Sequence, residues 1–251
     1  MKKLIAFIVI LTLIAILIGL YIVQINRTDT VDVLPKSMDK SAVSPSVGGI
    51  NPQNDQVVET PSEPLRPLSF FDHLSKAAIE RTMHSVVYDP KYVKIAYPMG
   101  DVPDDRGVCT DVVIRAYRSL GIDLQQLVHE DMAKNFKQYP AKKIWGSKRT
   151  DSNIDHRRVY NLQAFFKRFG ENLPITEDAK DYQPGDLVTW QITPKFPHIG
   201  IMVDVATSDP DRYMVVHNIA NGPQIDDILF AFPITGHYRY AENTSKKMSK
   251  P

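Results

Sequence analysis

The sequence predicts an α+β domain in which helices come first and an antiparallel sheet follows. Two observations carry this prediction. Before about Asp181 the apolar residues recur at helical spacing, whereas after it they form short runs separated by turn residues such as Pro184 and Gly185. Separate blocks of helices and strands are typical of the α+β class.

The composition excludes several classes of protein. The 251 residues carry 30 basic and 29 acidic side chains, so a formal charge of +1 gives no electrostatic reason to expect a nucleic-acid partner. The single cysteine, Cys109, excludes an intramolecular disulfide, and no Cys/His cluster has the spacing of a zinc site. We expect neither a metal nor an organic cofactor.

Residues 1–27 predict a transmembrane signal anchor. No charged residue occurs from Leu4 to Asn26, which is about the 20 residues that a helix needs to cross a bilayer. A cleaved signal peptide would have a shorter apolar core and a small-x-small site. Lys2 and Lys3 precede the span, so the positive-inside rule places the start in the cytoplasm. In a bacterium this predicts a single-pass inner-membrane protein with its main domain in the periplasm.

Residues 28–67 predict a disordered periplasmic linker. They contain six prolines and no aromatic residue, and a segment so poor in large apolar groups cannot offset the entropy lost on ordering. The texture then becomes globular, which predicts one folded domain over 68–243 and a flexible tail over 244–251.

Four helices are predicted in the first part of the domain. A capping box begins the first helix at Ser69. The second begins near Cys109 and ends at Gly121, and the third follows Asp123 as far as Pro140. The fourth ends at Gly170.

The strands are predicted from short apolar runs. They cover Leu187–Trp190, His198–Val205 and Tyr213–Ile219, and the segment Phe230–Tyr240 supplies more. A turn over Asp204–Arg212 would join the second and third of these strands into a hairpin.

Cys109 is the first candidate for chemistry. At a helix N-terminus the free backbone N–H groups and the helix dipole favour a thiolate, so we expect a lowered pKa and a nucleophilic sulfur. The alternative is a buried and inert cysteine.

Two histidines are candidates for its partners. In the predicted hairpin His198 falls opposite His217 or its neighbour Asn218, and directly opposed side chains lie on the same face of a sheet. A thiol, a histidine and a third polar group that orients the imidazole form the general triad of acyl transfer. The alternative is that each histidine is a structural residue at a strand end.

Several motifs of the domain occur in the order found in a known superfamily. They are Tyr97-Pro98-Met99-Gly100, Gly107-Val108-Cys109-Thr110-Asp111, Pro184-Gly185-Asp186-Leu187-Val188, His198-Ile199-Gly200-Ile201 and Val215-Val216-His217. In this order the sequence resembles the NlpC-type papain-like cysteine peptidases, which are bacterial cell-wall enzymes.

The sequence more closely resembles an uncharacterised bacterial family, a domain of unknown function grouped with that superfamily. This resemblance covers roughly residues 75–240. Its hallmarks are Gly107–Val113, Asn153–Arg158, His198–Gly200, His217–Ile219 and Gly236–Arg239.

The resemblance implies a papain-like fold and a role for each candidate. It implies that Cys109 attacks an amide carbonyl, that His198 transfers the proton, and that His217 orients His198, with Asn218 as the substitute. Tyr97 resembles the tyrosine that lines the substrate cleft of the superfamily, although it could equally be a core aromatic residue.

Arg157 and Arg158 lie at the start of the fourth predicted helix, where positive charge opposes the helix dipole. An anion should therefore compensate them. One candidate is Asp155 or another carboxylate of the protein, and the other is a carboxylate of the substrate held by an arginine fork.

Together these observations predict a membrane-anchored cysteine hydrolase that cleaves an amide bond in peptidoglycan peptides. A lipid-directed thiol hydrolase or acyltransferase of the same superfamily is the enzymatic alternative. The non-enzymatic alternative is an envelope adaptor that binds peptide without cleaving it.

Overall fold

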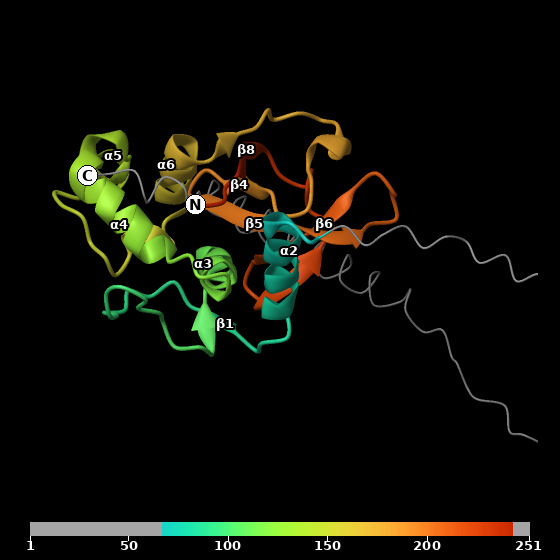
Figure 1. Cartoon of the computed structure of the whole chain (residues 1–251). Helices are drawn as coiled ribbons and strands as arrows, with labels where there is room; N and C mark the ends of the chain where they lie inside the picture. The colour runs from blue at the N-terminus through green and yellow to red at the C-terminus, as the bar shows by residue number, and fades with distance from the viewer. Residues whose placement is uncertain (1–66, 243–251) are drawn as a thin grey trace, which may run out of the picture. The chain divides into compact units, whose positions relative to one another are not determined.

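The computed structural model describes residues 67–242 (Figure 1). The predicted anchor over 1–27, the linker up to residue 66 and the tail over 244–251 therefore lie outside the described residues. Within residues 67–242, no helix is both long enough and apolar enough to span a membrane.

A six-stranded sheet forms the centre of the domain, and every strand in it is antiparallel to its neighbours. A separate parallel pair joins β1 (Val87–Tyr88) to β2 (Arg106–Gly107). In spatial order, the strands of the main sheet are β3 (Glu171–Asn172), β8 (Ile234–Arg239), β4 (Leu187–Thr193), β5 (Phe196–Ala206), β6 (Tyr213–Asn218) and β7 (Pro223–Asp226). The antiparallel sheet confirms the predicted α+β class.

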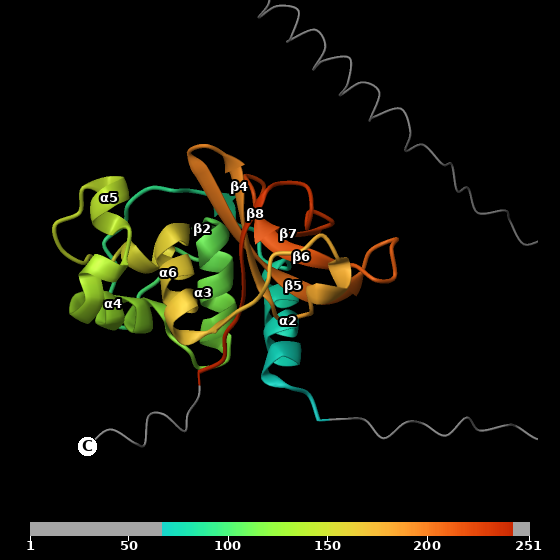
Figure 2. The same ribbon diagram turned by 90° about the horizontal axis from the view of Figure 1, so that it is seen from above.

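The helices begin and end close to the predicted signals. Ser69 caps the first helix by accepting a hydrogen bond from the Asp72 N–H, Asp123 caps the third predicted helix, and Gly170 ends the fourth. The α-helices are α2 (Phe70–Arg81), α3 (Cys109–Ser119), α4 (Leu124–Asn135), α5 (Ala141–Trp145) and α6 (Val159–Phe169), with 3-10 turns η1 (Phe136–Gln138), η2 (Asp155–Arg157) and η3 (Ala179–Asp181). Figure 2 shows α2, α3 and α6 on one side of the sheet.

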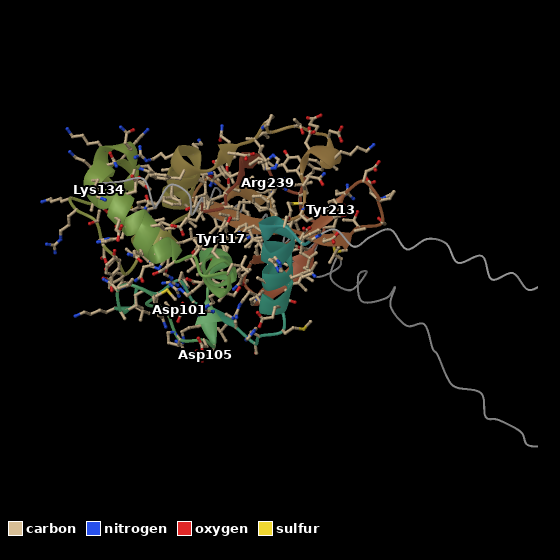
Figure 3. The ribbon with its side chains drawn as sticks, in the orientation of Figure 1. Asp101, Asp105, Tyr117, Lys134, Tyr213 and Arg239 are labelled. Atoms are coloured by element: carbon tan, nitrogen blue, oxygen red, sulfur yellow. The ribbon has the colours of Figure 1, made fainter. Side chains whose placement is uncertain are left out.

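The two faces of the sheet pack against different cores. On the helical side, Ile199, Ile201 and Val216 join α3 and α6 in the main core, where Tyr117 is fully buried (Figure 3). Alternate residues of the same strands, such as Trp190 and Met202, face a smaller second core. This alternation follows from the two-residue period of a strand, and it decides which face each site residue reaches.

Candidate functional site

Cys109 is the first residue of α3 and is buried, with 4% of its surface exposed. The helix begins here because the Asp111 carboxylate accepts a hydrogen bond from the Val108 backbone N–H at 2.7 Å, which satisfies one donor that the helix start leaves free. The predicted position of the cysteine at a helix N-terminus is therefore confirmed.

The sulfur of Cys109 lies against the backbone of β5. The N–H groups of Ile199, Thr110 and Cys109 itself form hydrogen bonds to the sulfur that favour the thiolate. The paired ladder between β5 and β6 stops at Ile201 and Val216, two residues beyond Ile199. The thiol therefore contacts the strand at the residue that directly follows His198.

The structure brings His198 and His217 together, as the sequence predicted. Their ring centroids are 5.2 Å apart and the rings are perpendicular. The register differs in detail, because Ile201 pairs with Val216, and continuing this pairing sets His217 opposite Gly200. The two histidines are therefore diagonal neighbours on the same face.

Gly200 makes room for this contact. A Cβ at this position would come within 2.6 Å of Val215 Cγ1, 2.9 Å of the Val216 carbonyl oxygen and 3.3 Å of His217 Cβ. Only glycine fits without a shift of the neighbouring strand, and its missing side chain leaves the space in which the His217 ring approaches His198.

His217 is oriented by Asp226, a residue of β7 that the sequence reasoning missed. The His217 Nε2 lies 2.9 Å from Asp226 Oδ2, whereas both ring nitrogens of His198 are buried without a hydrogen-bond partner among residues 67–242. The signal for Asp226 was weak, because β7 is a short, half-buried strand with no apolar run. We name Cys109, His198, His217 and Asp226 the thiol–histidine site.

The thiol and the rings of this site are not joined by a hydrogen bond in the described residues. The rings start from the face of the sheet that carries Trp190, whose ring centroid is 5.9 Å from that of His198. The sulfur approaches from the helical side, where Cys109 and Ile199 share the main core. His198, which carries one of the rings, and Ile199, which contacts the sulfur, are therefore consecutive residues of β5.

Burial favours the neutral form of the thiol and of the two imidazoles in the thiol–histidine site. It raises the pKa of the Cys109 thiol to about 12, outweighing the backbone N–H groups that favour the thiolate. Burial also lowers the pKa of His198 to about 3, with a smaller contribution from His217. The pKa of His217 is lowered by burial as well, although Asp226 opposes that shift. The predicted lowering of the Cys109 pKa is therefore wrong for this closed site, because desolvation exceeds the effect of the helix terminus.

Asn218, the substitute for His217, points to the other face of the sheet. Its side-chain amide donates a hydrogen bond to the Gly107 carbonyl at 3.4 Å, next to the start of α3. His217, and not Asn218, therefore contacts His198. Asn218 lies beside the loop that precedes Cys109.

Arg157 has a carboxylate partner within the protein. Its Nε and Nη2 donate to the two oxygens of Asp111, each at 2.8 Å, and both side chains are buried. This is the first of the two alternatives that the sequence left open for the arginine pair, with Asp111 in place of Asp155. The predicted role of Arg157 in substrate binding is corrected: its fork is occupied in stabilising the start of α3.

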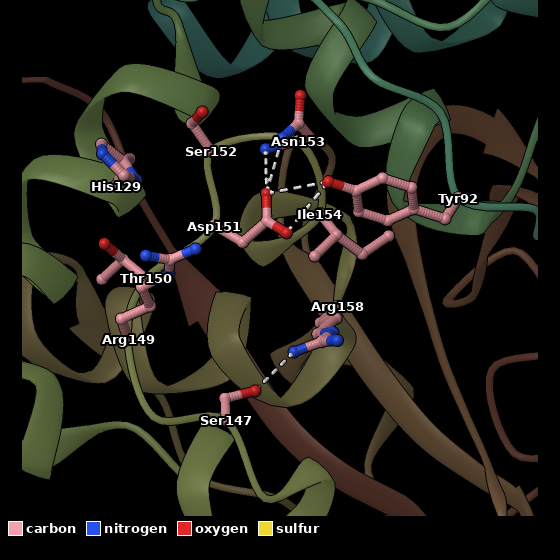
Figure 4. Close-up of a pocket in the computed structure, with 10 residues that line it drawn as sticks. All are labelled: Tyr92, His129, Ser147, Arg149, Thr150, Asp151, Ser152, Asn153, Ile154 and Arg158. Atoms are coloured by element: carbon pink, nitrogen blue, oxygen red, sulfur yellow. Dashed lines mark hydrogen bonds between the residues drawn. The ribbon is translucent and has the colours of Figure 1, made fainter.

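Arg158 lies beside a pocket of about 580 Å³ (Figure 4). The lining consists of Tyr92, His129, Arg158 and residues of the segment 147–154, which we name the polar pocket. The Arg158 guanidinium stacks 4.2 Å from the centroid of the Trp145 ring, and its Nη1 lies 3.4 Å from Ser147 Oγ and 3.8 Å from Asp155 Oδ1. Asp155, the predicted partner, is therefore a distant one.

Tyr97 packs against His129, a residue that lines the polar pocket, and not against the cysteine. Its ring centroid is 4.9 Å from that of His129, and 41% of its surface is exposed. Among residues 67–242 there is no cluster of three or more histidine, cysteine or acidic side chains that could hold a metal ion.

Comparisons with known proteins show which family the folded domain belongs to. Residues 75–240 match the family model described as a domain of unknown function, DUF1287. The chain is 50% identical over 167 residues to a protein of Escherichia coli (strain K12) with the name "Uncharacterized protein YijF", which covers 66% of this chain and 80% of that protein. No solved structure matches the chain significantly. The matched region contains both the thiol–histidine site and the polar pocket, and the chain belongs to the DUF1287 family.

Proposed function

We propose that the protein is a membrane-anchored cysteine hydrolase of the NlpC-type papain-like superfamily, which cleaves an amide bond in peptidoglycan peptides in the bacterial periplasm. The observation that carries the proposal is the position of three chemical groups along β5, with the thiol on the helical side of the strand and the two rings on its other face. The lone thiol contacts the backbone of Ile199, the preceding residue His198 has two unpartnered ring nitrogens, and the His217–Asp226 pair contacts its ring.

The uncharged resting state suits a general-base mechanism. A neutral His198 can accept the thiol proton as the Cys109 sulfur attacks the carbonyl carbon, and the resulting imidazolium can give that proton to the leaving amine. Water then attacks the thioester with His198 again as the base, which releases the acid and restores the thiol. His217, held by its contact with Asp226, would be the third member of the triad. It would orient the His198 ring and so stabilise that ring when it is charged.

The helix start supplies the donors for the oxyanion. The backbone N–H groups of Cys109 and Thr110 point toward the sulfur, so they lie where negative charge develops when a carbonyl is attacked there. This proposal requires the sulfur and the His198 ring to come within hydrogen-bond reach when substrate binds, as catalytic hydrogen bonds often do.

Burial of the thiol favours one alternative, an envelope adaptor that binds peptide without cleaving it. With 4% of Cys109 exposed and its pKa raised to about 12, the closed site holds little thiolate at neutral pH. The polar lining of the neighbouring pocket, in contrast, gives no support to a lipid-directed enzyme, which would need apolar walls for an acyl chain.

The test is hydrolysis of defined muropeptides by the full chain purified in mild detergent, with the products weighed by mass spectrometry. We expect cleavage by the wild type, none by Cys109→Ala, and a loss of about 10²–10⁴ in rate for His198→Gln. Cys109→Ala should unfold within about 1 kcal/mol of the wild type, because it removes one buried heavy atom.

The control is His84→Gln, which changes an exposed histidine beyond the end of α2 and should leave the rate unchanged. Cleavage by Cys109→Ala at the wild-type rate would overturn the mechanism. Binding of muropeptides by the wild type without any cleavage would establish the adaptor instead.

A further inference from the structure

The polar pocket contains an arginine whose charge is poorly compensated. The Arg158 Nη1 has Ser147 and Asp155 as neighbours at 3.4 and 3.8 Å, while its Nε and Nη2 have no hydrogen-bond partner among residues 67–242. Its consecutive neighbour Arg157, by contrast, spends two donors on one carboxylate. Arg158 therefore keeps two donors of its fork for a ligand.

The same guanidinium is held in a fixed orientation. Its central carbon lies over the Trp145 ring, 4.2 Å from the ring centroid, and 22% of the side chain is exposed. Stacking of this kind restricts rotation while it leaves the edge of the fork open. A fork fixed in advance loses less entropy when it binds a planar anion.

The one acidic group of the pocket lining is already satisfied. Asp151 Oδ1 accepts hydrogen bonds from the Asn153 backbone and side chain at 3.0 and 2.7 Å, and its Oδ2 accepts one from the Tyr92 hydroxyl at 3.0 Å. Arg149 adds a second positive charge, and Figure 4 shows the guanidinium groups of Arg149 and Arg158 on two sides of the pocket. The lining thus carries an excess of positive charge.

The loop that forms the pocket is fixed by the rest of the domain. The Asn153 Oδ1 accepts a hydrogen bond from the Ile95 N–H at 2.9 Å, and the Ser152 carbonyl accepts one from Gln125 at 3.0 Å. The pocket is also joined to the thiol–histidine site, because the hydroxyl of Thr110, next to Cys109, donates to the Arg157 carbonyl at 3.1 Å. One turn of chain thus connects the two regions.

We propose that the polar pocket binds the free carboxylate of an acidic peptide, with Arg158 as the bidentate donor and Arg149 as the second positive charge. The proposal deepens the proposed function and rests on it for the identity of the peptide, which is the stem peptide of peptidoglycan. Bidentate arginine–carboxylate pairs combine strength with a fixed geometry, so such a site would select substrates with a free carboxylate over amidated ones.

The experiment measures binding to the full chain carrying Cys109→Ala, so that no turnover interferes. Two probes are titrated by calorimetry: the tripeptide L-Ala-γ-D-Glu-meso-diaminopimelate, and the same tripeptide with its carboxylates converted to carboxamides. We expect the amidated probe to bind about ten- to a hundredfold more weakly, the range for hydrogen bonds to a charged group.

Variants then assign the effect to the pocket. Arg158→Gln and Arg149→Gln should each weaken binding of the free tripeptide, and Arg158→Lys should lie between the wild type and Arg158→Gln because it keeps the charge but not the fork. Arg212→Gln is the matched control, since Arg212 is similarly exposed and pairs with Asp227 outside the pocket. It should bind both probes as the parent does.

Each outcome separates this proposal from the hydrolase. Equal binding of the two probes, or wild-type affinity in both Arg158→Gln and Arg149→Gln, would overturn the carboxylate site even if muropeptides are cleaved. Carboxylate-dependent binding that is lost in Arg158→Gln would support the site even if no bond is cut.

Discussion

The thiol–histidine site and the polar pocket lie on either side of one short turn, and they treat charge in opposite ways. Arg157, at the end of η2, is buried in a bidentate pair with Asp111 beside the start of α3. Arg158, the next residue, faces the pocket with only distant partners. Burial favours the neutral form of the buried thiol and imidazole groups of the thiol–histidine site, whereas the lining of the polar pocket contains two arginines.

The difference in burial gives the two regions different electrostatic properties. A dry site disfavours charge at rest, so its electrostatic interactions are strong when charge develops during a reaction. An open polar site can hold a permanent charge at little cost, because water solvates it until a ligand replaces the water. Under the two proposals above, reactivity would belong to the thiol–histidine site and recognition to the adjacent polar pocket.

Removing the carboxylate on the buried side should have the largest effect of all. Asp111→Ala leaves Arg157 buried without a carboxylate partner and should destabilise the domain by about 3–5 kcal/mol in urea unfolding. Arg158→Gln, on the open side, should cost less than about 1 kcal/mol. A double variant, Asp111→Leu with Arg157→Met, should recover much of the loss because no charge is left buried. Equal losses for Asp111→Ala and Arg158→Gln would contradict the contrast between the two regions.

The second-largest effect is expected from acid, which should lower the free energy of unfolding through the buried histidines. Burial lowers the pKa of both His156 and His198 to about 3, whereas an unfolded histidine titrates near 6.5. Below about pH 6.5 the unfolded chain therefore binds protons that the folded chain does not, so the free energy of unfolding falls as pH drops toward 3. Each histidine contributes a slope of up to about 1.4 kcal/mol per pH unit.

Urea unfolding between pH 7 and pH 4 measures this slope. His156→Gln should make it shallower, because this substitution removes one titrating group from the main fold without touching the thiol–histidine site. His84→Gln, at an exposed position, should leave it unchanged. A slope that His156→Gln does not alter would show that other groups govern the acid response.

The smallest effect is expected for a substitution of Asp226, which lies next to the buried histidine rings. Asp226→Asn keeps the shape of the side chain but removes the charge that opposes the lowered pKa of His217. If the hydrolase proposal holds, kcat should fall about tenfold, or roughly 1.4 kcal/mol, with KM almost unchanged. The pH profile should change as well, because Asp226 acts as a positioning residue through an imidazole.

The adjacent Asp227→Asn serves as the control, since Asp227 pairs with Arg212 on the surface. It should leave both kcat and the pH profile as they are. An identical effect of the two substitutions would remove Asp226 from the site.

Local signals predicted most of the elements and part of the site. Ser69, Asp123 and Gly170 marked helix ends correctly, because capping and helix termination depend on neighbours in the chain. The pairing of His198 with His217 could also be predicted, since a hairpin brings close residues together in a regular register. β7 escaped notice because a short strand with half-buried residues has no distinct pattern.

The amino-acid sequence alone was enough to predict the class of fold, the helix start at Cys109 and the strands that carry the two histidines. Each of these depends on periodicity and caps within a few residues. The fold as a whole assigned the rest. The tertiary structure pairs Arg157 with Asp111, places Arg158 beside the pocket and sets Asp226 next to His217. It also raises the pKa of the thiol, which the helix start was expected to lower. These outcomes depend on burial and on contacts between residues distant in the chain, which no local pattern encodes.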